Sequence, residues 1–76
     1  MIDARPRKRS LTLHGHRTSV SLEDAFWIAF VHMARDRGVS VNALAAQIDR
    51  ERGVSAGLAS AIRVTVLKHV QRAPED

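Results

Sequence analysis

Hydrophobic and polar residues alternate over residues 17–22 and then change to a helical spacing without an intervening linker. Because successive side chains of a strand point to opposite faces, the alternation predicts a β-strand with one apolar face. From residue 23 onward, apolar residues recur at intervals of three and four, which is typical of a helix with one buried face. The residues expected to face inward are Thr18, Val20 and Leu22 in the strand and Phe26, Ala29, Phe30, Met33 and Ala34 in the helix.

Signals at both ends delimit this first helix. We expect it to begin near Leu22 or Glu23, with Ser21 as its N-cap and acidic residues beside the positive end of the helix. Cations in the last turn and Gly38 directly after it are typical of a helix C-terminus.

Two further helices follow. Ser40 is the expected N-cap of a second helix over residues 41–52, and Ser55 is the expected N-cap of a third helix ending near Gln71. The residues expected to face inward are Val41, Leu44, Ala45 and Ile48 in the second helix and Leu58, Ala59, Ile62, Val66, Leu67 and Val70 in the third.

The N-terminal segment is expected to divide into two parts. Residues 1–9 are predicted to be a basic, flexible arm, because like charges and a proline oppose compact structure. Residues 10–13 alternate in polarity and are followed by a glycine between two histidines. Since Gly15 can form a turn or a bulge, this segment either extends the main strand or folds back on it. The expected domain spans residues 10–72, and residues 73–76 form a frayed tail.

The basic charge is concentrated at the N-terminus. Of the formal net charge of +4, all is accounted for by residues 1–17, which hold five basic residues against one acidic residue. Such a segment attracts a polyanion, most simply nucleic acid, although a solvated tail is the alternative. The basic residues of the arm are Arg5, Arg7, Lys8 and Arg9.

The sequence favours an oligomer. A single strand leaves its backbone unpaired, and a second copy of the same chain is the simplest partner. Residues 26–31 are consecutively apolar, so more than one side of the first helix needs cover. A chain of 76 residues also buries little surface by itself. The alternative is a compact three-helix monomer with Trp27 half exposed.

The strand, the helix, the turn at residues 38–42 (Gly-Val-Ser-Val-Asn) and the second helix resemble the ribbon-helix-helix DNA-binding family. The stretch over residues 17–23 (Arg-Thr-Ser-Val-Ser-Leu-Glu), followed by Phe-Trp, is similar to small bacterial proteins of this family. The resemblance implies a mainly α fold with one short β-strand per chain. It further implies an intertwined homodimer whose two-stranded antiparallel ribbon is intermolecular, with an extra third helix here.

The resemblance also implies site residues. In the family the ribbon enters the major groove of double-stranded DNA, and outward strand residues contact bases. Those positions are Arg17, Ser19 and Ser21. The start of the second helix binds a backbone phosphate, here at Ser40, Val41 and Asn42, and the arm residues Arg5, Arg7, Lys8 and Arg9 add phosphate contacts. The implied dimer core contains Thr18, Val20, Leu22, Phe26, Phe30, Met33, Leu44 and Ile48.

Other chemistry is not expected. His14 and His16 are spaced so that both could meet a metal from one strand, but no third ligand lies nearby, so we expect no metal site. No catalytic sequence motif is present, and we expect neither an enzyme nor a cofactor. The sequence has no cysteine, no transmembrane-length apolar run and no signal peptide, so a cytoplasmic, nucleoid-associated protein is expected.

Three functions therefore compete. The first is a homodimeric DNA-binding protein with modest direct base recognition, acting as a transcriptional repressor or autoregulator. The second is an antitoxin-type DNA-binding protein with a toxin partner, although only a few residues follow the third helix and could bind a toxin. The third is a protein-only dimerisation or interaction module. The third helix could enlarge the core or hold a dimer of dimers or a partner.

Overall fold

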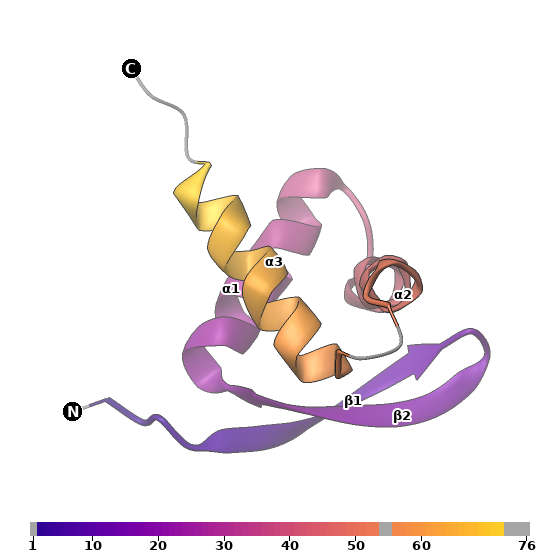
Figure 1. Cartoon of the computed structure of the whole chain (residues 1–76), viewed down its shortest axis with the longest axis horizontal. Helices are drawn as coiled ribbons and strands as arrows, with labels where there is room; N and C mark the ends of the chain where they lie inside the picture. The colour runs from indigo at the N-terminus through magenta and orange to yellow at the C-terminus, as the bar shows by residue number, and fades with distance from the viewer. Residues whose placement is uncertain (1, 54–55, 73–76) are drawn as a thin grey trace.

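The computed structural model describes residues 2–53 and 56–72 and contains two strands followed by three helices (Figure 1). The strands β1 (Pro6–Leu13) and β2 (His16–Glu23) form a two-stranded antiparallel sheet. The helices are α1 (Asp24–Arg37), α2 (Val41–Glu51) and α3 (Leu58–Gln71). Figure 1 shows all three helices above one face of the hairpin, so the opposite face of the sheet is uncovered.

A two-residue turn connects the strands. His14 and Gly15 both have positive φ, 53° and 82°, which is the geometry of a type I′ turn, and its twist matches that of antiparallel strands. Residues 10–13 therefore fold back on the main strand, one of the two options that the sequence left open. Pairing continues from Leu13–His16 to Pro6–Glu23. Residues 6–9, expected in the flexible arm, consequently belong to β1.

The partner of β2 is β1 of the same chain, whereas the sequence led us to expect a second copy. Each chain thus has two strands where one was expected, because the tight turn lets the chain supply the partner itself. The expected two-stranded antiparallel ribbon is present, but it is intramolecular. Pairing of β2 no longer requires an intertwined homodimer, and the homodimer stays a prediction.

The start of α1 differs from the expectation and its end agrees with it. Ser21 lies within β2 and does not cap the helix; the N-cap residue is Glu23, and its side chain makes no capping hydrogen bond. Because β1 reaches back to Pro6, sheet pairing continues to Glu23 and the helix begins later. Gly38 has left-handed φ (70°), and its N–H donates to the Arg35 carbonyl at 3.0 Å, which ends α1 as predicted.

The caps of α2 and α3 are of different kinds. Ser40 caps α2 as predicted, since its Oγ accepts a hydrogen bond from the Ala43 N–H at 3.0 Å. The N-cap of α3 is Gly57. Ser55, the expected cap, and the expected tail at residues 73–76 lie outside the described residues.

One hydrophobic core lies between the sheet and the helices. It is built from the inward residues of both strands and one face of each helix. Burial of these side chains removes apolar surface from water, which is the main stabilising contribution in a domain of this size. The buried residues are Leu11, Leu13, Val20, Leu22, Phe30, Met33, Ala34, Leu44, Ala45, Ile48, Ile62 and Val66.

Eight residues expected inside are less buried: three are exposed (Thr18, Leu67 and Val70), and five are partly buried (Phe26, Ala29, Val41, Leu58 and Ala59). Thr18 is exposed, because α2 packs against β1 and leaves the turn end of β2 uncovered. Phe26 is partly buried and packs against the core. Leu67 and Val70 are 51% and 56% exposed, since the C-terminal half of α3 projects away from the hairpin (Figure 1).

The apolar surface of α1 is covered partly by its own chain. Trp27 is half-buried, with its ring 6.0 Å from that of Phe30 and 5.4 Å from the guanidinium of Arg9. Ile28 is 54% exposed. The rest of the chain thus covers Trp27 in part and leaves Ile28 uncovered.

Candidate nucleic-acid interface

The uncovered face of the hairpin carries alternate residues of both strands. The register places Lys8 opposite Ser21, Ser10 opposite Ser19 and Thr12 opposite Arg17. All of these side chains are exposed, and none is acidic. We call these six residues the open face: Lys8, Ser10, Thr12, Arg17, Ser19 and Ser21.

The two cations of the open face are available to a ligand. Within the described residues, neither Lys8 nor Arg17 forms an ion pair. Lysine, arginine and hydroxyl side chains are the groups that contact phosphates and the edges of bases in the major groove. The open face therefore has the chemistry of a polyanion-binding surface.

The sequence led us to expect base contacts from only half of this face. The expected base-contact residues Arg17, Ser19 and Ser21 lie on it together. Lys8 was expected to contact phosphate from the arm, and Ser10 and Thr12 were given no role. The period-two pattern extended back from Leu13 to Lys8, together with a glycine turn, is the signal that could have found all three.

The remaining arm cations are engaged in ion pairs. Arg5 and Arg7 approach the Asp3 carboxylate at 3.4 Å and 2.8 Å, and Arg7 also lies 3.4 Å from Asp24. The Arg7 hydrogen bond is the main cause that lowers the pKa of Asp3. Arg9 lies on the inward side, where it pairs with Asp24 and its side chain is 18% exposed. The predicted phosphate contacts of Arg5, Arg7 and Arg9 thus compete with carboxylates, and Arg9 is mainly a packing residue.

The first turn of α2 lies at the edge of β1. The Asn42 side chain accepts a hydrogen bond from the Thr12 N–H at 3.0 Å. The main-chain amides of Val41 and Asn42 have no hydrogen-bond partner among the described residues. Such amides, at the positive end of a helix dipole, favour an anion. The expected phosphate-contact residues of α2 are therefore next to the open face.

A shallow hollow joins these two groups of residues. Its lining includes Arg17 from β2 and Asn42 from α2. The structure thus brings together an expected base-contact residue and an expected phosphate-contact residue on one side of the hairpin. The other residues of the lining are Ser10, Leu11 and Thr12.

The opposite edge of the hairpin is held by α3. Two nitrogens of the Arg63 guanidinium donate to the Glu23 carboxylate at 2.9 Å and 3.0 Å, and Nη2 also donates to the Ser21 carbonyl at 3.3 Å. The hydrogen bonds from Arg63 are the main cause that lowers the pKa of Glu23. Arg63 also lies over the Phe26 ring, 5.9 Å from its centroid. No sequence signal identified this link, which fixes α3 to the end of β2.

The histidines of the hairpin turn form no cluster of metal ligands. His14 Nε2 lies 3.2 Å from Asp49 Oδ2, and Arg52 approaches the same carboxylate at 2.7 Å. The hydrogen bond from Arg52 is the main cause that lowers the pKa of Asp49, with a smaller contribution from His14. In the part of the chain that the structure describes, no three histidine or carboxylate side chains are grouped to hold a metal.

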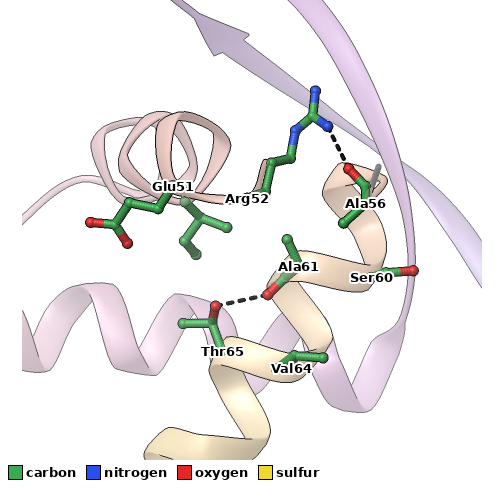
Figure 2. A pocket seen from close by; sticks show the side chains of 8 residues that line it. Glu51, Arg52, Ala56, Ser60, Ala61, Val64 and Thr65 are labelled. Atoms are coloured by element: carbon green, nitrogen blue, oxygen red, sulfur yellow. Dashed lines mark hydrogen bonds between the residues drawn. The ribbon is translucent and has the colours of Figure 1, made fainter. Parts of the chain in front are cut away.

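A second hollow lies between the end of α2 and α3 (Figure 2). Arg52 donates to the Ala56 carbonyl across its rim, and the Thr65 hydroxyl donates to the Ala61 carbonyl at 2.7 Å. Arg52 and Thr65 are thus engaged with the backbone, and apolar side chains make up much of the rest of the lining. This hollow has no group of free polar side chains converging on one point.

The order of elements, the antiparallel ribbon and the capped turn between α1 and α2 define the ribbon-helix-helix fold. A family profile for the ribbon-helix-helix domain matches residues 6–70. The chain belongs to this family, whose members are regulatory DNA-binding modules. Neither the search of curated proteins nor the search of solved structures gave a match. None of the helices in the described ranges is long and apolar enough to cross a membrane.

Proposed function

We propose that the chain binds double-stranded DNA with a sequence preference and acts as a transcriptional repressor or autoregulator. The hairpin would enter the major groove with the open face toward the bases. The observation that carries this proposal is the open face itself, with two unpaired cations, four hydroxyls and no carboxylate.

Base recognition would depend mostly on one side chain. Arg17 can hold a guanine through two hydrogen bonds, whereas the hydroxyls of Ser19 and Ser21 can donate to or accept from several bases. Discrimination between sequences is therefore modest, and phosphate contacts supply much of the affinity. The free amides of Val41 and Asn42 are suited to a phosphate beside the groove, with Ser40 fixing the helix start.

The predicted homodimer needs a surface other than the ribbon. The family typically binds DNA as dimers. An exposed apolar row runs along α3 through Val64, Leu67 and Val70 at helical spacing, and these side chains are 52%, 51% and 56% exposed. We propose that a second copy covers this row, and that each copy keeps its own hairpin. A dimer of dimers would then use another exposed apolar residue, such as Ile28.

The exposed apolar row of α3 is also the feature that favours the two alternative functions. An antitoxin-type protein or a protein-only module would use it for a foreign protein instead of a second copy. Solution mass separates these cases, because a dimer that Leu67→Asp converts to a monomer favours the homodimer. A chain that is monomeric before and after that substitution contradicts it. A DNA-binding role implies residence with the nucleoid in the cytoplasm.

Titration of duplex DNA at several salt concentrations tests the proposal. Binding should weaken linearly on a double-logarithmic plot, with a slope of roughly −0.9 for each phosphate neutralised. Binding to one selected sequence should exceed binding to a scrambled duplex of equal length. A folded protein that binds neither duplex at low salt would contradict the proposed function and leave the protein-only module.

A further inference from the structure

The two strands of the hairpin have similar sequences. Residues 10–13 of β1 are Ser-Leu-Thr-Leu, and residues 19–22 of β2 are Ser-Val-Ser-Leu. Each segment has a hydroxyl, an aliphatic residue, a second hydroxyl and a leucine, and the two segments are nine positions apart. The second strand thus repeats the first in chemistry as well as in polarity.

The pairing register makes this repeat approximately symmetric in space. Ser10 lies opposite Ser19, and a half-turn about an axis between them exchanges the two antiparallel strands. The same half-turn moves each β1 residue onto the residue nine positions later, so Lys8 falls on Arg17 and Thr12 on Ser21. The open face therefore has a cation and a hydroxyl on each side of a central serine pair.

We propose that a single chain reads both halves of an inverted-repeat DNA element, with Arg17 over one half and Lys8 over the other. This inference rests on the proposed function and specifies its DNA ligand. A duplex presents equivalent base edges on its two strands about a local two-fold axis. A ribbon with a matching axis can place one cation against each strand.

The geometry of the strands sets the spacing of the element. The Lys8–Ser21 pair and the Thr12–Arg17 pair are separated by four residues along the hairpin. At about 3.4 Å per residue this is roughly 14 Å, or about four base-pair steps. The preferred element should thus have one guanine on each strand about four base pairs apart, because guanine is the base that arginine and lysine contact best.

The outer edges of the two strands are bonded by other parts of the same chain, which argues against a ribbon shared between two copies. The two-residue turn directs the main-chain groups of Thr12 and Ser21 outward, away from the partner strand. The Asn42 side chain binds the Thr12 N–H, and Arg63 binds the Ser21 carbonyl. A strand from a second copy would have to displace Arg63 to pair with β2 at this position.

The first experiment compares two variants on DNA. Duplexes with a randomised centre are selected by the unmodified protein, by Lys8→Ala and by Arg17→Ala. The unmodified protein should select both guanines, whereas each variant should select one guanine and lose its preference in the other half. Arg17→Ala should weaken the selected duplex by roughly 5- to 150-fold. Lys68→Ala and Arg72→Ala, at the far end of α3, are matched controls that should keep both halves.

The second experiment measures stoichiometry. The Leu67→Asp chain, which should not dimerise through α3, and a longer, tagged version of it are mixed on the shortest duplex that retains preference, and the complexes are separated by native electrophoresis. One chain per element gives two shifted bands, whereas a dimer on the element gives a third band of intermediate mobility. Circular dichroism confirms that each variant is folded, which the exposure of both side chains leads us to expect.

The outcomes separate this inference from the function on which it rests. The loss of one guanine preference in each variant and two bands support it. A symmetric loss in both halves for Arg17→Ala, no change for Lys8→Ala, or an intermediate band overturns it and leaves DNA binding intact. No binding of the unmodified chain to any duplex overturns the proposed function together with this inference.

Discussion

The Asn42 side chain accepts the Thr12 N–H at 3.0 Å and thereby ties the first turn of α2 to the edge of β1. The hydrogen bond joins residues 30 positions apart in the sequence. It sets the position of the α2 amides relative to the open face. A helix start and a hairpin that would contact different parts of DNA are thus held in one fixed geometry.

This contact allows stability and DNA binding to be separated at one residue. Asn42→Asp keeps an oxygen that can accept the Thr12 N–H, so the free energy of unfolding should change by less than about 0.5 kcal/mol. The added negative charge beside a phosphate should weaken DNA binding and flatten the salt slope by roughly 0.9, as for one lost phosphate contact. Asn42→Ala should instead lose about 0.5–1.5 kcal/mol of stability. Urea unfolding and salt titrations measure both quantities, and equal DNA affinity for Asn42→Asp and the unmodified chain would contradict the phosphate assignment.

Arg17 is expected to carry most of the base preference. Arg17→Ala should weaken binding to the preferred duplex by about 1–3 kcal/mol and should weaken binding to a scrambled duplex less. Fluorescence anisotropy on both duplexes measures the ratio. Arg72→Ala removes the same charge far from the hairpin and serves as the control. An equal loss on both duplexes for Arg17→Ala would assign Arg17 to phosphate contact only.

Leu22 and Leu67 test the position of the core. Leu22 is fully buried, whereas Leu67 is 51% exposed. Leu22→Ala should lower the free energy of unfolding by about 2–5 kcal/mol through lost burial and the cavity that remains. Leu67→Ala should change it by less than about 0.5 kcal/mol in a monomer. A larger loss at Leu67 that grows with protein concentration would indicate that a second copy covers α3.

The hairpin turn depends on Gly15. Its φ of 82° lies in the left-handed region, and a Cβ built there would meet no atom within 4 Å. Gly15→Ala should therefore cost about 1–2 kcal/mol through backbone strain alone. Gly57→Ser is the control, because Gly57 has an ordinary φ of −71°, equally open surroundings and an N-cap position that favours serine. Chemical unfolding compares the two, and equal effects would contradict a strained turn.

The ion pair between Glu23 and Arg63 predicts that the free energy of unfolding falls at acidic pH. The pKa of Glu23 is lowered from its ordinary value of 4.5 by the Arg63 hydrogen bonds. A carboxyl with a lowered folded-state pKa stabilises the fold above its ordinary pKa, and this contribution is lost as the pH falls through the folded-state value. Thermal unfolding between neutral pH and pH of about 3 should show this loss.

Variants show how much of the loss of stability in acid is due to the ion pair between Glu23 and Arg63. Arg63→Met keeps much of the apolar stem and should reduce the loss of stability on acidification, as should Glu23→Gln. The double variant should add little to either single change, since both remove the same interaction. An unchanged acid dependence in Arg63→Met would assign the effect to Asp3 and Asp49, whose pKa values are lowered by other arginines.

Local signals predicted the helices well and the hairpin poorly. Gly38 and Ser40 act as expected because a left-handed C-terminal residue and a hydroxyl N-cap depend on only a few neighbouring residues. The hairpin was left open because His14 has positive φ, which is uncommon for any residue other than glycine, so the turn was not evident. Once the hairpin forms, β2 has its partner and Ser21 is drawn from the helix start into the strand.

Periodicity alone could not set how much of each element is covered. Leu67 and Val70 share a helical spacing with the buried Ile62 and Val66, but α3 extends beyond the elements that it packs against. The link between Arg63 and Glu23 joins residues 40 positions apart. Such a contact depends on the assembled fold, and neither the residue types nor their spacing in the sequence predicts it.

The two-residue turn at His14 and Gly15 also determines how the ribbon responds to dilution. Strands contributed by separate molecules come apart when the protein becomes scarce, because their association obeys mass action. Strands joined through a peptide turn stay together at any abundance, and a hairpin closes within microseconds. The first molecule synthesised in a cell would therefore carry as complete a ribbon as any later one.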